Sequence, residues 1–181
     1  MNQDSCFYCD KNPSQVLDGR PLCDQCFKDH VEKKLKKHLR GYGIKAGSHM
    51  VASELAAQVL ERVLGGLPLK ISNEDVEPFD HLVTCETLDD ECCRFLNNLF
   101  FGDLRQSKDP KCIPLFLPLT DDEVATYSSM LRLPFTPKPK PKESHELLKK
   151  LISFFPHVRN NLLKSSKELA ACVSKEKSPP S

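Results

Sequence analysis

Apolar residues recur at helical spacing soon after the N-terminal region of the chain. They lie four residues apart, with lysines between them, at Phe27, Val31, Leu35 and Leu39. This spacing predicts an amphipathic helix that begins near Gln25 and turns its apolar stripe toward a core. Gly41 and Gly43 follow the stripe and predict the end of the helix.

Residues 48–131 alternate between helical stripes and short apolar runs. Residues 51–64 form a second stripe, with Ser48 as the predicted cap and Gly65 and Gly66 as the stop. Residues 81–86 and 112–117 are predicted strands, and Pro114 places the second strand at a sheet edge or a strand start. Helices are expected over 92–101 and over 120–131, where Thr120 and Glu123 form a capping box. This order of elements predicts an α/β fold.

The C-terminal third is predicted to be helical beyond a proline-rich connection. Residues 134–142, PFTPKPKPK, are rich in Pro and Lys and are expected to be extended. A helix capped by Ser144 is expected next, then a break at Pro156, a last helix over 157–173 and a disordered tail. The predicted units are a cysteine module (1–27), an α/β body led by the basic helix (28–133), the linker (134–142), a helical pair (143–173) and the tail (174–181).

Charge is distributed unevenly although the formal net charge is only +1. Residues 27–45 carry a net charge of +5 and residues 131–181 carry +7, whereas residues 1–26 carry −2 and residues 46–130 carry −9. Two basic segments that flank an acidic middle favour an anionic partner that touches both. The alternative is that these charges are only the solvated faces of helices, which are often rich in lysine.

The strongest chemical signal is a pair of CxxC turns, formed by Cys6, Cys9, Cys23 and Cys26. Each turn points two thiolates at one ion, so two turns supply a closed tetrahedral sulfur shell of the kind that holds structural Zn²⁺. An iron–sulfur cluster is the alternative occupant. The other five cysteines, Cys85, Cys92, Cys93, Cys112 and Cys172, are interpreted as buried free thiols.

The sequence lacks the motifs of several enzyme, nucleotide-binding and membrane protein classes. The sequence contains no P-loop, nucleophile elbow, Gly-rich dinucleotide loop or Ser-Gly-Gly, so we expect neither catalysis nor ATP binding. No apolar stretch reaches the ~20 residues of a membrane helix, and the polar N-terminus lacks the apolar run of a signal peptide. We therefore expect a cytoplasmic protein with no membrane partner.

The order of motifs resembles the cytoplasmic tRNA 2-thiolation proteins, in particular their non-catalytic second subunit. The double CxxC leads into a basic helix, and RGYGIKAGSHMVASELAAQVLERVLGGLPL looks like the family's small-residue helix with its Gly-rich corner. CIPLFLPLTDDEVATYSSMLRLPF is similar to the family's strand and helix, with Pro118, Leu119, Glu123 and Tyr127 at matching positions. Family members are much longer, and the nucleotide-binding half of their body has no counterpart between the basic helix and Arg40.

This resemblance implies a truncated, helix-rich Rossmann-like domain, a degenerate PP-loop or adenine nucleotide alpha hydrolase-like fold, behind a zinc-ribbon-like module. It implies a heterodimer with a catalytic thiouridylase subunit that thiolates the wobble uridine of tRNA, with sulfur from a ubiquitin-related carrier. The expected phosphate contacts are Lys33, Lys34, Lys36, Lys37, Arg40, Lys138, Lys140 and Lys142. The alternative function is a zinc-ribbon adaptor for protein interactions with no tRNA role.

Overall fold

The computed structural model describes residues 5–17, 19–73, 78–102 and 109–175. The N-terminal part holds a two-stranded hairpin, β1 (Gln15–Leu17) and β2 (Arg20–Leu22), followed by α1 (Asp24–Leu39) and the 3-10 turn η1 (Arg40–Tyr42). The body comprises β3 (His49–Ala52), α2 (Glu54–Val63), β4 (Lys70–Ser72), β5 (His81–Thr84), α3 (Leu88–Phe101), β6 (Cys112–Pro114) and α4 (Asp121–Leu131). The last helices are α5 (Lys142–Phe154) and α6 (Val158–Lys175), and the predicted tail from residue 176 lies outside the described residues.

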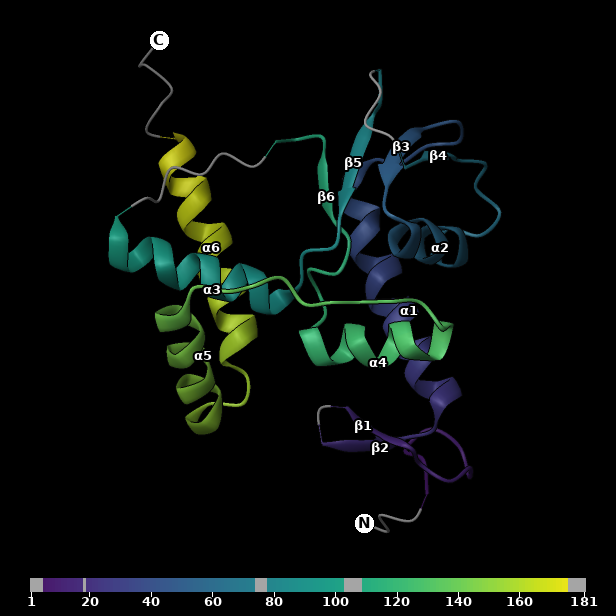
Figure 1. The fold of residues 1–181 in the computed structure, drawn as a ribbon, viewed down its shortest axis with the longest axis horizontal. Helices are drawn as coiled ribbons and strands as arrows, with labels where there is room; N and C mark the ends of the chain where they lie inside the picture. Colours follow the sequence, from purple (N-terminus) through teal and green to yellow (C-terminus); the bar gives the residue numbers. More distant parts are fainter. Residues whose placement is uncertain (1–4, 18, 74–77, 103–108, 176–181) are drawn as a thin grey trace.

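Four parallel strands form the central sheet, in the order β4-β3-β5-β6 (Figure 1). Met50 and Ala52 of β3, Val83 of β5 and Ile113 of β6 belong to the main hydrophobic core, together with the apolar stripes of α1, α2 and α4. Strands buried in this way are typical of α/β proteins. The predicted α/β fold class is therefore confirmed.

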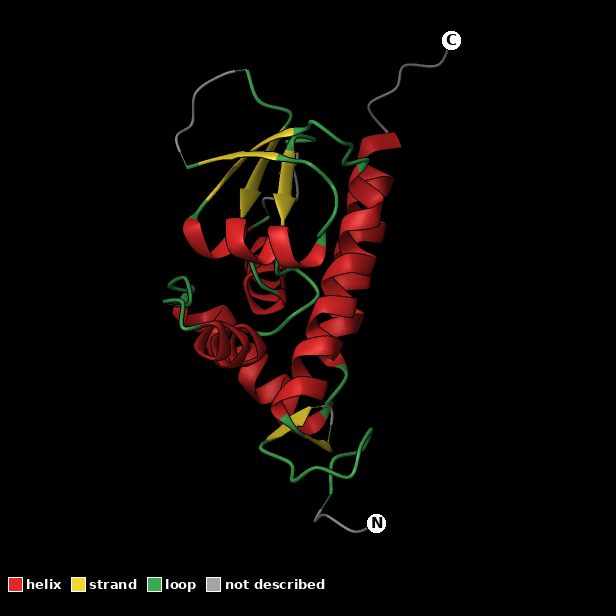
Figure 2. Ribbon diagram, turned by 90° about the vertical axis from the view of Figure 1, so that its right-hand side faces the viewer, coloured by secondary structure: helices red, strands yellow, loops and turns green. Residues whose placement is uncertain are grey.

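A second, smaller core joins α3 to α5 and α6, beside the sheet rather than over it (Figures 1 and 2). Its buried members are Leu88, Cys92, Cys93 and Leu96 of α3 and Leu148 of α5. Cys92 and Cys93 are adjacent on α3, so their side chains leave the helix about 100° apart. Both are buried because other elements surround α3 on more than one side.

Several predicted elements appear as expected. All four residues of the first stripe, Phe27, Val31, Leu35 and Leu39, are buried on α1. Thr120 and Glu123 form both hydrogen bonds of the capping box of α4. β6 is an edge strand, as Pro114 indicated, although it ends at this residue instead of continuing to residue 117.

Two predicted caps are wrong. Residues 49–52 form a strand, and α2 is capped by Ser53, whose hydroxyl accepts a hydrogen bond from the amide of Ala56, instead of by Ser48. The error arose because Met50, Val51 and Ala52 are apolar at every position, as in a doubly buried strand, and a continuous apolar run also fits a helical stripe. Likewise, α5 begins at Lys142 after Pro141, and Ser144 lies inside the helix, where its hydroxyl donates to the carbonyl of Pro141.

Of the helices in the described part of the chain, none combines the length and the apolar character required to cross a bilayer. The proline-rich connection runs in extended form along α4 toward α5 (Figure 1). It thereby links the two hydrophobic cores.

Candidate metal centre and basic helix

The N-terminal cysteines lie on two tight turns that face each other. The amide of Cys6 donates to the carbonyl of Lys11 at 2.9 Å, which closes the first turn, and the amide of Phe7 donates to the carbonyl of Pro21 on β2 at 2.8 Å. Cys23 is the N-cap residue of α1, so the second CxxC turn is the first turn of this helix. The hairpin β1–β2 therefore folds one pair of cysteines onto the other.

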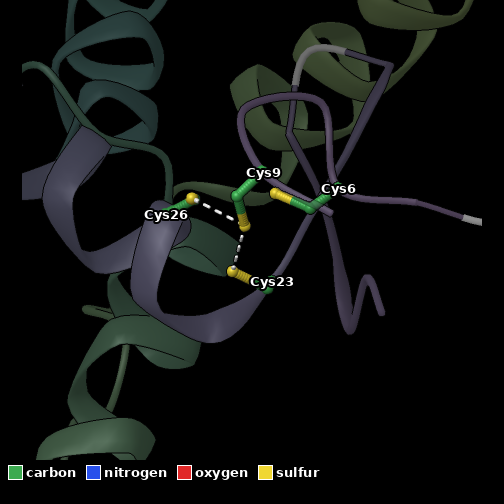
Figure 3. A group of neighbouring side chains, drawn as sticks. All are labelled: Cys6, Cys9, Cys23 and Cys26. Atoms are coloured by element: carbon green, nitrogen blue, oxygen red, sulfur yellow. Dashed lines mark hydrogen bonds between the residues drawn. The ribbon is translucent and has the colours of Figure 1, made fainter. Parts of the chain in front are cut away.

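All four sulfur atoms point toward one another (Figure 3). The Sγ of Cys9 lies 3.6 Å from that of Cys23 and 3.7 Å from that of Cys26, and all four sulfurs lie within 4.8 Å of one another. Four sulfurs around a single ion at about 2.3 Å are separated by roughly 3.8 Å in a tetrahedron. The sulfur atoms thus have the spacing of a one-ion shell, and these four cysteines could bind a metal.

The surroundings of these thiols shift their pKa values in opposite directions. Burial favours a higher pKa for Cys6, but hydrogen bonds from the backbone of Cys23, Tyr8 and Cys9 outweigh burial and lower its pKa to about 6. Burial and the neighbouring thiols raise the pKa of Cys26 to about 12. A bound cation favours the thiolate form of every ligand, so metal binding by this set releases protons.

Four of the five predicted phosphate contacts in this region lie on one side of α1 and its C-terminal extension. Lys33, Lys36, Lys37 and Arg40 are spaced at i, i+3, i+4 and i+7, and all four are exposed. We call these four residues the basic stripe. Lys34 lies off the stripe, and its ammonium forms an ion pair with Glu123 of α4 at 2.8 Å.

The three linker lysines differ in their surroundings. Lys142 is exposed at the start of α5, and Lys138, with half of its side chain exposed, lies 3.6 Å from Glu86. The side chain of Lys140 is only 4% exposed, and its ammonium lies 2.9 Å from Asp90 and 2.6 Å from Asp121. Lys140 therefore holds the linker against α3 and α4. Unlike the lysines of the basic stripe, it is not exposed.

Two arrangements were not identified from the sequence. Tyr127 is fully buried and donates a hydrogen bond to Glu32, which also pairs with Arg62. The exposed aromatic side chains of Phe7 and Tyr8 lie between the first two cysteines, and the guanidinium of Arg20 lies 4.6 Å from the ring centre of Phe7. Two aromatic residues inside the first CxxC turn were the available signal for the second arrangement.

The prediction that the other five cysteines are buried holds for only some of them. Cys92 and Cys93 are buried, and burial raises the pKa of each thiol, to about 12 and about 11 respectively. Cys85 and Cys112 are half-buried at the sheet. Cys172 is exposed on α6, so the prediction that it is buried is wrong.

Comparison with known proteins identifies a fold but no family. No model of a known protein family matches the chain. No curated protein matches it by sequence. Among solved structures, the chain is similar to the U34-tRNA thiolase NcsA from Methanococcus maripaludis, a structure with its 4Fe–4S cluster. The TM-score is 0.68 at 18% identity, over 94% of this chain and 88% of that chain, so the two share a fold.

Proposed function

We propose that this chain is a non-catalytic subunit of a complex that 2-thiolates the wobble uridine of tRNA, and that it binds the tRNA. The observation that carries the proposal is the fold shared with a U34-tRNA thiolase over 94% of the chain. The lack of Ser-Gly-Gly and of any other phosphate-binding loop in the sequence supports a non-catalytic role. In this proposal a separate catalytic subunit carries out the thiolation, with sulfur from a ubiquitin-related carrier.

The basic stripe is the proposed contact with tRNA phosphates. Lys33, Lys36, Lys37 and Arg40 are exposed cations on one side of a helix that is fixed to the core by its opposite, apolar side. Lysine and arginine neutralise phosphates and release counterions, so they add affinity without reading sequence. Lys138 and Lys142 are secondary candidates, whereas Lys34 and Lys140 are occupied by acidic partners.

Changing the stripe to acid tests this function. In a variant with Lys33, Lys36 and Lys37 replaced by Glu, we expect weaker binding to every tRNA. The salt dependence should also flatten, by roughly 0.7–0.9 in log–log slope for each lost phosphate contact. Fluorescence anisotropy of the full chain with labelled tRNA at several salt concentrations measures both quantities.

The matched control replaces Lys149, Lys150 and Lys164 by Glu, three exposed or largely exposed lysines on α5 and α6. This variant has the same change in net charge at a different place. The tRNA-binding proposal is contradicted if both variants bind tRNA as the wild type does, or if the wild type does not bind tRNA. Either result would favour the alternative function, an adaptor for protein interactions.

We further propose that the metal is one structural zinc ion, held by Cys6, Cys9, Cys23 and Cys26. The sulfur spacing supports a single ion, because the cysteines of a cubane cluster each bind a different iron and therefore stand further apart. Metal analysis of the purified chain should give about one equivalent of zinc, and Cys23→Ser should lose it. An iron chromophore, or a full chain that retains no zinc when purified, would contradict this assignment.

A further inference from the structure

Phe7 and Tyr8 are large aromatic side chains on the outside of the metal-binding turn. They are 45% and 53% exposed, and their rings meet edge to face with centroids 5.1 Å apart. The turn beneath them is fixed, because Phe7 is hydrogen-bonded through its amide to β2 and the cysteines on either side belong to the metal centre. Two rigid, solvent-exposed rings require little ordering on binding, so they suit recognition of a planar partner.

One cationic side chain contacts this aromatic pair. The guanidinium of Arg20 lies 4.6 Å from the ring centre of Phe7, in cation–π contact, and the Arg20 side chain is itself exposed. Lys11, at the end of the same turn, is also exposed. A polyanion can therefore approach the rings with local charge compensation.

The metal-binding turn also lies at one end of the basic stripe. Cys26, Lys33 and Arg40 are seven residues apart, which is close to two helical turns, so they lie on the same side of α1. From Cys26 to Lys37 the helix rises by about 16 Å. The row of cations thus runs along α1 toward the turn that carries the two exposed aromatic rings.

Exposed aromatic rings can stack on unpaired bases, and a row of cations can contact the phosphates of the same strand. We infer that Phe7 and Tyr8 stack against unpaired bases of the tRNA whose phosphates lie along the basic stripe. The inference rests on the proposed tRNA-binding function and specifies how the N-terminal module contributes to it. Stacking on aromatic side chains is how proteins recognise single-stranded RNA, whereas the bases of a duplex are paired and not available.

The test compares a stacking variant with a charge variant on two RNAs. The full, zinc-loaded chain with Phe7→Ala and Tyr8→Ala should lose affinity for tRNA by at least roughly thirtyfold, since two base–aromatic stacks are lost and each is worth about 1–3 kcal/mol. Its salt dependence should equal that of the wild type, because no charge has changed. Its affinity for a short RNA duplex without loops should also be unchanged.

Two further variants control for folding and for general loss of apolar surface. Phe7→Trp with Tyr8→Trp should keep the tRNA affinity, because both rings are retained. Phe154→Ala with Phe155→Ala removes two other exposed aromatic rings, 75% and 63% exposed, at the end of α5, and should leave tRNA affinity unchanged. Zinc content shows that the turn is intact in each variant.

Three outcomes would overturn the inference. The alanine variant could bind tRNA like the wild type, which would assign the two rings to contact with a protein instead. It could lose affinity equally for tRNA and duplex, which would mean that no unpaired base is bound. If the wild-type chain binds neither RNA, the proposed function itself fails, and this outcome is distinguishable because it precedes any effect of the variants.

Discussion

At the scale of single residues, Tyr127 shows how an element is fixed by one polar contact. Its side chain is fully buried in the main core, and its hydroxyl donates to Glu32 of α1 at 2.9 Å. Burial and the nearby Glu32 carboxylate raise the pKa of Tyr127 far above its usual value, so the hydroxyl remains a donor across the physiological range. The same carboxylate accepts from Arg62 of α2, so one acidic side chain connects three helices.

Removing only this hydroxyl gives a residue-scale prediction. Tyr127→Phe should lower the free energy of unfolding by about 1–2 kcal/mol, because a hydrogen bond to a charged acceptor is lost while the ring remains packed. Urea denaturation measures the change. Ser129→Ala is the control on the same helix, since that exposed hydroxyl only donates to the carbonyl of Thr126 and should change stability by less than about 0.5 kcal/mol. Equal effects of the two substitutions would mean that the bond to Glu32 contributes nothing.

At the scale of elements, the proline-rich linker is held by one buried cation. Lys140 places its ammonium between Asp90 on α3 and Asp121 on α4, close to the N-termini of both helices. Thr87 reinforces the junction, because its hydroxyl donates to Asp121 at 2.6 Å. The linker thus joins the main core to the small core that contains α5 and α6.

Removing the cation of Lys140 tests how strongly the linker is held. Lys140→Met should reduce the free energy of unfolding by about 2–3 kcal/mol, because two carboxylates lose the charge that compensates them. The effect should be below the largest values known for buried pairs, since both carboxylates retain some contact with solvent. Urea denaturation checks the value.

Lys138→Met is the matched control for the linker. Its side chain is about half exposed and its ion pair with Glu86 is long, at 3.6 Å, so it should cost less than about 1 kcal/mol. If Lys138→Met proved as destabilising as Lys140→Met, position 140 would have no special role in holding the linker.

At the scale of the whole molecule, the two hydrophobic cores predict which segments are destabilised when a metal bound by the four cysteines is removed. Cys6 and Cys23 belong to the main core together with Leu17, Leu22 and Phe27, whereas the core of α3, α5 and α6 contains none of the N-terminal residues. The cluster of four cysteines is therefore continuous with one core and separate from the other.

Chelation should consequently have a graded effect. When a metal-loaded chain is treated with chelator, amides of the hairpin and of the first turn of α1 should exchange with deuterium much faster, because the four cysteines lose the ion that would hold them together. Amides of α3 and α5 should exchange at unchanged rates. Hydrogen exchange read by mass spectrometry follows each segment, and faster exchange throughout α3 and α5 would contradict the separation of the two cores.

The sequence by itself determined several helices and the candidate metal ligands of this protein. The spacing of apolar residues fixed α1, because a four-residue repeat has few alternatives, and Thr120 with Glu123 fixed the start of α4. The double CxxC identified the four clustered cysteines, because metal ligands have characteristic spacing. Local patterns of this kind depend on neighbours along the chain, and these are visible in the sequence.

Only the tertiary structure decided which charges are available and which apolar run is a strand. Lys140 and Lys142 are two residues apart in the same basic segment, yet one is enclosed by carboxylates from α3 and α4 while the other is exposed. Residues 49–52 are a strand because β4 and β5 flank them, although their apolar run also fitted a helix. In both cases the deciding partners are distant in sequence, and long-range contacts cannot be predicted from periodicity alone.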